Sequence, residues 1–269
     1  FAGTQHPNTT ALSLSAVSIA AFCLWRSGER TLTALILFAV SFGFLVLTKS
    51  RTSAAGVLAA LLFLWTLSTP FKVKFGVAAC LGWVIGVGVI LVLLSGWSIE
   101  DDVSRIALMG REEQSESLTG RIPIWTELSP WIGRRLLTGY GYDSFWTPDH
   151  IDRVSRELQW GIREAHSAYM DLALSVGILA AAALLVGLAL GMRRAAALYL
   201  SQGRPEHGFI LGLQLFCLIN ALTESAMVMP LFIPFIAASG MAHVVLNDDE
   251  ACDDRDVRSV GGCRAPLAC

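Results

Sequence analysis

Long apolar stretches separated by short polar connections dominate the hydrophobic pattern of the chain. Seven of these stretches are long enough, or nearly long enough, to cross a bilayer: residues 10–24, 32–47, 54–68, 76–94, 168–192, 208–229 and 231–246. A membrane helix needs roughly 20 apolar residues, so this pattern predicts an all-α, polytopic membrane helix bundle of about seven spans. The mean hydropathy of +0.57 agrees with a chain that lies largely in lipid.

Basic residues follow every second apolar stretch, and this alternation predicts the orientation of the bundle. They are Arg26 and Arg30 after the first stretch, Lys72 and Lys74 after the third, and Arg193, Arg194 and Arg204 after the fifth. Cytoplasmic loops are enriched in Lys and Arg, so we expect these connections inside the cell. The N-terminal stretch and residues 48–52, 96–165 and 229–230 are then expected on the periplasmic side.

The same pattern divides the chain into four parts. Transmembrane helices are expected over residues 1–95 and 167–246, one large periplasmic loop domain over 96–166, and a disordered cytoplasmic tail over 247–269. The sequence starts at Phe1 without an initiator Met, so we expect that upstream spans are missing or that the sequence is a fragment.

The predicted loop domain differs in composition from the rest of the chain, because it contains five of the eight Trp residues. Apolar residues at helical spacing predict a helix over residues 122–135, and Gly139–Tyr142 predicts a turn after it. The Trp and Tyr side chains fit either an aromatic belt at the membrane interface or a sugar-stacking site. The segment lacks Cys, so disulfides cannot stabilise it.

Lys49 and Arg51 are cations in a short connection that the topology places outside. Positive charge there opposes the usual bias, so we infer a local reason for keeping it, and an anionic ligand is the simplest one. The net charge of −2 for the whole chain gives no indication of nucleic-acid binding.

Arg121 and His166 are further candidates within or beside the loop domain. Arg121 precedes the predicted helix, where backbone amides favour an anion and a guanidinium can hold phosphate in bidentate geometry. A surface charge paired with carboxylates is the alternative. His166 starts the fifth apolar stretch and is a candidate proton acceptor, or else an interfacial histidine. Tyr169, one turn further, is a candidate pocket residue.

Glu224 falls within the sixth apolar stretch, near its outer end. A charged carboxylate costs roughly 2.5 to 3.5 kcal/mol at the centre of a bilayer, so this side chain is expected to face protein and pair with a cation. Arg51 is a candidate partner. A structural ion pair explains Glu224 as well as a substrate contact does.

Small residues recur every four positions along the fifth apolar stretch, at Ala173, Gly177 and Ala181. This spacing places them on one side of a continuous helix. Small side chains let membrane helices approach closely, so the sequence predicts a helix-packing face there.

Five short motifs occur in a fixed order. They are Thr48-Lys49-Ser50-Arg51, Gly120-Arg121, Gly139-Tyr140-Gly141-Tyr142, Phe145-Trp146, and His166-Ser167 followed after nine residues by Gly177. In this order and spacing they resemble the O-antigen ligase and polymerase family. The stretch from Gly139 to Trp146 is most similar to its exopolysaccharide-polymerizing branch. The resemblance covers residues 1 to about 246.

The chain departs from the family pattern at two positions. Ala180 stands where the family has Gly, Thr or Tyr, and as a replacement for Gly it is a small-for-small change. Pro7 stands where a family segment, Gly-x-x-x-His-Lys-Asn, usually has Lys. Because that segment lacks its cation, His6 and Asn8 are not counted among the expected site residues.

The resemblance implies a multi-pass glycosyltransferase of the bacterial inner membrane, with an active site that faces the periplasm. It implies an undecaprenyl-pyrophosphate glycan as substrate, with no cofactor and no metal; membrane lipid and other polysaccharide assembly and export proteins are the expected partners. For this chemistry we expect the pyrophosphate to bind cations and an acceptor hydroxyl to lose its proton. The expected substrate-binding residues are Arg51, Arg121, Lys49 and Tyr169, and the expected proton acceptors are His166 and then Glu224.

Three functions fit these observations. One is a polymerase that joins lipid-linked repeat units into exopolysaccharide or O-antigen, and the second is a ligase that transfers the glycan to lipid A core or protein. The third is a non-enzymatic carrier of lipid-linked sugars. The similarity over residues 139–146 favours the polymerase, and internal repeats that would favour a carrier are not seen.

Overall fold

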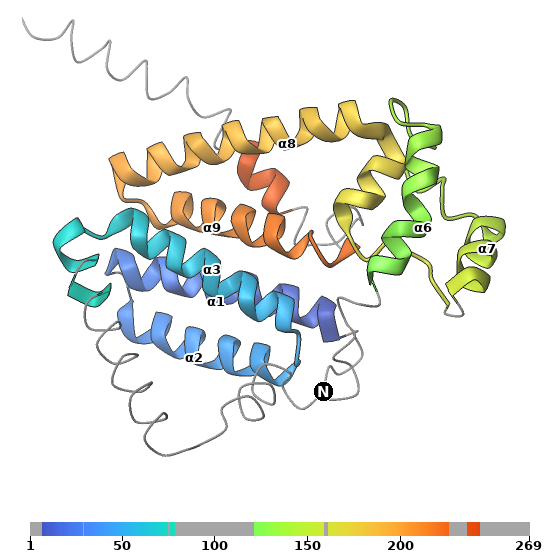
Figure 1. Cartoon of the computed structure of the whole chain (residues 1–269). Helices are drawn as coiled ribbons and strands as arrows, with labels where there is room; N and C mark the ends of the chain where they lie inside the picture. Colours follow the sequence, from blue (N-terminus) through green and yellow to red (C-terminus); the bar gives the residue numbers. More distant parts are fainter. Residues whose placement is uncertain are drawn as a thin grey trace, which may run out of the picture.

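A computed structural model describes residues 7–28, 30–74, 76–78, 121–158, 161–225 and 236–242. Within these ranges every regular element is a helix, which confirms the predicted all-α class (Figure 1). The helices are α1 (Pro7–Ser27), α2 (Thr31–Leu47), α3 (Arg51–Ser68), α6 (Arg121–Arg134), α7 (Pro148–Leu158), α8 (Ala168–Gln202) and α9 (Pro205–Asn220). The predicted span at 76–94 and the predicted tail lie largely or wholly outside the described residues.

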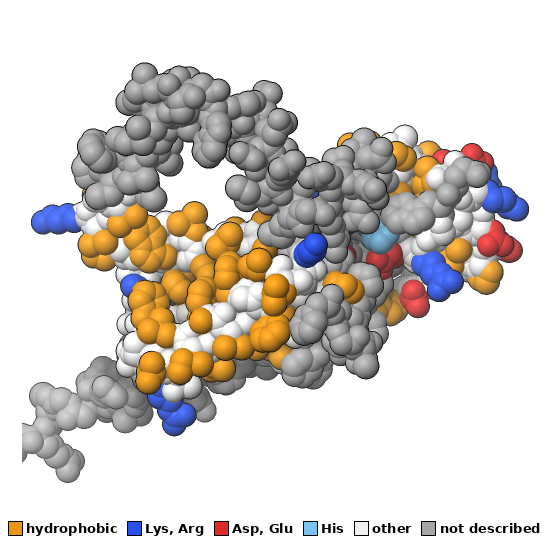
Figure 2. All heavy atoms as spheres, turned by 90° about the horizontal axis from the view of Figure 1, so that it is seen from below, with side chains coloured by type: hydrophobic (Ala, Val, Ile, Leu, Met, Phe, Trp, Pro, Cys, Tyr) orange, Lys and Arg blue, Asp and Glu red, His pale blue; other side chains and the backbone are white. Residues whose placement is uncertain are grey.

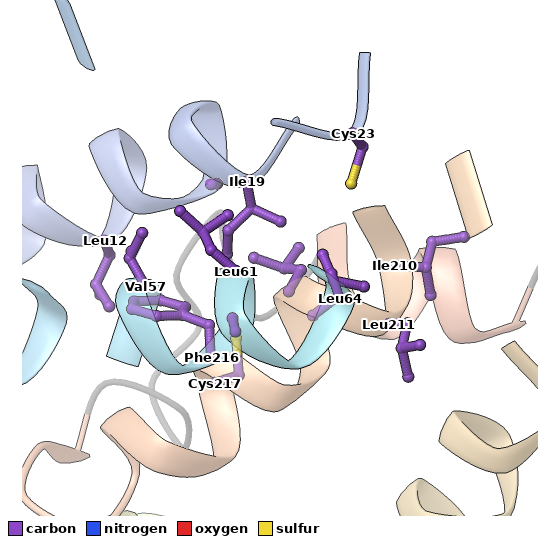
Figure 3. Packing of buried hydrophobic residues seen from close by; sticks show 14 of the residues in the cluster. Leu12, Ile19, Cys23, Val57, Leu61, Leu64, Ile210, Leu211, Phe216 and Cys217 are labelled. Carbon is purple, nitrogen blue, oxygen red and sulfur yellow. The ribbon is translucent and has the colours of Figure 1, made fainter. Parts of the chain in front are cut away.

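Four helices form a bundle, and α8 runs alongside α9 at its edge (Figure 1). α1 packs against α2, α3 and α9, and α8 packs against α9. Figure 1 shows α6 and α7 beside one end of this bundle. Figure 3 shows the core that α1, α3 and α9 share, where Ile19, Leu64 and Phe216 are fully buried. Burial of these apolar side chains holds the three helices together.

Small polar residues complete the contact between α1 and α2. The hydroxyls of Ser18 and Ser41 lie 2.9 Å apart, and both residues are buried. Small side chains let the two backbones approach, and their hydroxyls hydrogen-bond across the contact instead of remaining unsatisfied.

Three of the described helices, α1, α3 and α8, are long and apolar enough to cross a membrane, and α2 is a shorter apolar helix. Figure 2 shows a broad face of hydrophobic side chains over the bundle, while the acidic side chains visible there lie at the end that carries α6 and α7. Exposed apolar residues on α2 and α8, such as Leu32, Leu47 and Val186, fit contact with lipid. These features identify the chain as a membrane protein.

The sixth predicted stretch differs from the structure at its C-terminal part. α9 ends at Asn220, and residues 221–223 form a turn. Glu224 therefore lies after α9 and not within a helical span. This placement removes the cost of a carboxylate inside a continuous membrane helix.

α8 is interrupted at Gly177, so the predicted packing face on a continuous helix was wrong. Gly177 has φ 77° and ψ 170°, a conformation that is essentially restricted to glycine. A Cβ atom there would lie 2.3 Å from the carbonyl oxygen of Leu137. Gly177 is thus required by the backbone and by the close approach of another chain segment.

The loop after α6 hydrogen-bonds the backbone groups around this interruption. Tyr140 donates its N–H to Leu174 O (2.7 Å), and Gly141 donates to Ser175 O (2.8 Å). Ile178 donates its N–H to Leu136 O (2.8 Å). A broken helix leaves N–H and C=O groups without partners inside the helix, and unpaired groups are costly in lipid. The loop supplies those partners.

A second hydrophobic core joins α6, α7 and the start of α8. Its fully buried members include Ile124, Leu128, Phe145, Val154 and Ile162, and Leu174 of α8 belongs to it. The predicted helix over 122–135 is confirmed as α6, and the predicted turn follows it, with positive φ at Gly139 and Gly141. This core fixes α6 and its loop against the membrane helix.

Replacing Gly177 by Ala should destabilise the protein by roughly 2 to 5 kcal/mol, because backbone strain and overpacking act together. Gly187 is the matched control, since it lies on the same helix and a Cβ there meets nothing within 4 Å. Gly187→Ala should leave the melting temperature of the detergent-solubilised protein unchanged or slightly higher. Equal melting temperatures for the two variants would contradict the role of the interruption.

The orientation predicts which cysteine variants a membrane-impermeant maleimide can reach. Lys49, in the turn between α2 and α3, and Lys72, after α3, are both exposed. In intact cells with a permeabilised outer membrane, Lys49→Cys should be labelled and Lys72→Cys should not. Labelling only at residue 72 would reverse the orientation and would exclude a periplasmic site.

Candidate active site

The ends of α1, α3, α6, α8 and α9 lie on the same side of the molecule (Figure 1). For α1, α3, α6 and α8 these are N-terminal ends, and for α9 it is the C-terminal end. These are also the ends that the predicted topology places together outside the membrane. N-terminal helix ends carry partial positive charge, so their convergence favours an anion.

Polar side chains connect the start of α3 to the end of α9. Asn220 donates its side-chain N–H to Ser53 Oγ (3.2 Å), and both residues are buried. Thr223 Oγ1 lies 3.1 Å from Thr52 Oγ1. These contacts place Arg51, the first residue of α3, beside the turn that Glu224 follows.

Glu224 lies at the centre of this region. Its Oε1 atom is 3.1 Å from a guanidinium nitrogen of Arg121, and both side chains are less than one fifth exposed. Asn8 of α1 donates to the same carboxylate oxygen at 3.0 Å. The carboxylate therefore connects the start of α1, the start of α6 and the turn after α9.

The turn after α9 also contacts the start of α8. The N–H of Ala168 donates to Ala221 O (3.0 Å) and to Glu224 O (3.2 Å). Tyr169 donates its hydroxyl to Leu218 O (2.8 Å). Tyr169 thus ties α8 to α9, and its predicted contact with substrate stays a prediction.

His166 lies immediately before α8 and has a left-handed backbone conformation, with φ 50°. Its Nδ1 atom is 3.2 Å from Glu164 Oε1, and each side chain is about one quarter exposed. A carboxylate at Nδ1 fixes the orientation and tautomer of an imidazole. The pair therefore has the arrangement of a partly exposed base.

Burial and charge act in opposite directions on Glu224. Burial raises the pKa of this carboxyl above its ordinary value, while the charges of Arg121 and His166 lower it. Burial is the larger effect, so a proton is held more tightly than on an exposed Glu.

The predicted cations have different positions. Arg121 is the first residue of α6, at the place where the sequence expected it, and its guanidinium binds Glu224. Arg51 is partly buried at the start of α3, and Lys49 is exposed in the preceding turn with φ 57°. The structure thus brings Arg121, His166 and Glu224 together, with Arg51 near them.

Three residues of this region were not among the expected site residues. Glu164 pairs with His166, and Asn8 binds Glu224. The buried carboxylate of Asp171 accepts hydrogen bonds from Ala165 and Ser225, which are the chain neighbours of His166 and Glu224. Asn8 does lie in the family-like segment at the N-terminus, where Pro7 replaces the usual Lys. That segment was the available signal, because its Asn8 binds Glu224.

Among the described residues, no group of three or more His, Cys, Asp and Glu side chains could hold a metal ion. The polar groups of this region are instead arranged as pairs, Arg121 with Glu224 and His166 with Glu164. Such pairs can bind an anion at the arginine and accept a proton at the histidine.

Comparison of the sequence with known protein families gives a match. A model of the family described as O-Antigen ligase matches residues 36–185, which is more than half of the 269 residues. The match includes Arg51, Arg121, His166 and Gly177. A search of curated proteins finds no match to the chain. On the strength of the family match, the chain belongs to the O-antigen ligase family.

Proposed function

We propose that this protein is a metal-independent membrane glycosyltransferase that polymerises undecaprenyl-pyrophosphate-linked oligosaccharide repeat units. The reaction takes place on the periplasmic face of the bacterial inner membrane and yields exopolysaccharide or O-antigen. Family membership supports a transfer reaction that uses lipid-linked glycans. The single observation that carries the proposal is the convergence of the Arg121–Glu224 and His166–Glu164 pairs at one end of the bundle.

The arginines bind the pyrophosphate of the donor. A guanidinium about 4 Å from a phosphate oxygen contributes roughly 4 kcal/mol of gross Coulomb attraction at an effective dielectric near 20. Arg121 has this role most directly, because Glu224 and the start of α6 fix its position. Arg51 and Lys49 add positive charge from the α2–α3 connection, and the N-terminal helix ends add to it.

His166 accepts the proton of the acceptor hydroxyl. The hydroxyl oxygen forms a bond to the anomeric carbon of the donor, and the bond from that carbon to the pyrophosphate oxygen breaks. The electron pair stays on the pyrophosphate, where the arginines stabilise the new charge. The proton moves to His166, which Glu164 orients, and such general-base assistance contributes about a hundred- to ten-thousand-fold in rate.

Glu224 is the second candidate for the proton acceptor. Its raised pKa makes it a stronger base than an exposed glutamate. Its hydrogen bonds to Arg121 and Asn8, however, occupy the carboxylate in holding Arg121 in place. We therefore assign the proton to His166 and the positioning of Arg121 to Glu224.

The acceptor that fits best is a second lipid-linked glycan. This choice rests on the similarity of residues 139–146 to the exopolysaccharide-polymerizing branch. A ligase would use the same donor site and base but a different acceptor, so the sizes of the products distinguish the two: a polymerase gives a ladder of lengths, and a ligase gives one transfer per acceptor.

Replacing Arg51 or Arg121 by Lys should weaken binding of the lipid-linked donor about tenfold or more, because Lys keeps the charge but loses the bidentate geometry. Titration of the purified protein with the donor measures the dissociation constant. Arg26→Lys is the matched control, since Arg26 lies at the opposite end of α1 and its guanidinium contacts Ser68. An unchanged dissociation constant for both site variants would remove the arginines from the donor site.

Replacing His166 by Ala should abolish polymer formation and leave donor binding and protein abundance near wild type. His166→Asn is the stricter variant. Asn tolerates the left-handed backbone at this position and can still donate to Glu164, but it has no basic nitrogen. Both variants should lose at least about a hundredfold in turnover. If His166→Asn retained most of its turnover, the proton acceptor would have to be sought at Glu224.

A further inference from the structure

Asp171 is a buried carboxylate in the first turn of α8, and it accepts hydrogen bonds from three separate segments. Its Oδ1 atom accepts from Trp146 Nε1 (2.8 Å) in the loop domain. The N–H of Ala165 contacts both carboxylate oxygens, at 3.2 and 3.3 Å. The hydroxyl of Ser225 donates to Oδ2. The side chain is only 6% exposed, so these donors replace the water that a carboxylate would otherwise bind.

The donors to Asp171 lie next to the proposed active-site residues along the chain. Ala165 directly precedes His166, and Ser225 directly follows Glu224. One carboxylate therefore holds the segment that carries the base and the segment that carries the partner of Arg121. Both oxygens of Asp171 already accept these hydrogen bonds, so we assign the role of the base to His166 and not to Asp171.

We propose that Asp171 is a positioning residue of the transferase, which fixes the separation between His166 and the Glu224–Arg121 pair through Ala165 and Ser225. The inference rests on the proposed function. Its physical basis is the sensitivity of proton and group transfer to distance, because a misplacement of about 1 Å can cost on the order of a hundredfold in rate. A charged acceptor suits this task, since its hydrogen bonds are shorter and stronger than neutral ones.

A second contact keeps the same segments attached when Asp171 is perturbed. The backbone N–H of Ala168 donates to Ala221 O and Glu224 O, and neither hydrogen bond involves the Asp171 side chain. Loss of the Ser225 hydroxyl should therefore leave the turn in place but less precisely held. A Ser225 variant should therefore still fold, and a loss of its activity can be measured on folded protein.

The test compares Ser225→Ala with wild type in the full-length protein, using an undecaprenyl-pyrophosphate oligosaccharide as substrate. We expect kcat to fall about tenfold or more, while KM for the donor and the melting temperature stay close to wild type. Ser225→Thr retains the hydroxyl and should restore most of kcat. Ser129→Ala is the matched control, because the exposed Ser129 hydroxyl donates to Trp125 O within α6 and, among the described residues, contacts neither Asp171 nor Ser225.

A double variant tests whether the effect passes through Asp171. Asp171→Asn should also lower kcat, and adding Ser225→Ala to it should cause little further loss, because both changes affect the same contact. Independent, additive losses would overturn the proposal. So would a parallel fall of kcat and melting temperature in Ser225→Ala, which would make the contact purely structural.

The wild-type measurement separates this inference from the function on which it rests. If wild type forms product and Ser225→Ala equals it, the positioning role is wrong while the transferase survives. If wild type forms no product from the lipid-linked substrate, the proposed function fails and the positioning role fails with it.

Discussion

The interruption of α8 at Gly177 and the hydrogen bonds that complete it are the constraint on which the rest of the structure depends. The interrupted helix exposes backbone groups that lipid cannot satisfy, and the loop at residues 136–141 provides their partners. Residues 136–141 are thereby attached to α8 through their main chain, and both Gly139 and Gly177 are needed for the close approach. With α6 fixed in this way, Arg121 at its start reaches Glu224.

The electrostatic arrangement follows from that attachment. Glu224 is buried enough to raise its pKa, yet it is paired with Arg121 and hydrogen-bonded by Asn8. If the two side chains separated, each would leave a buried charge without a partner, which is costly. The pair therefore holds Arg121 in one place. The N-terminal ends of four helices face the same region, and their partial charges favour the anionic part of a lipid-linked donor.

The sequence was sufficient for features that depend on local pattern. Apolar periodicity predicted α6, and the position of Arg121 at its start followed from it. It was insufficient where distant segments decide the outcome. The four-residue spacing of small residues is compatible with a continuous helix. The break at Gly177 involves hydrogen bonds with residues 136–141, and the spacing contains no information on those contacts. The Arg121–Glu224 pair joins residues 103 positions apart, and no local pattern encodes such a pairing.

Photo-crosslinking of a lipid-linked donor tests most directly whether this end of the bundle binds the substrate. A donor analogue with a diazirine on the isoprene unit next to the pyrophosphate would be activated on the purified protein, and the labelled peptides would be identified by mass spectrometry. The account predicts labelling of peptides that contain Arg51, Arg121, His166 or Glu224, with competition by unlabelled donor. Competed labelling confined to the opposite end, near Arg26 and Ser68, would contradict it.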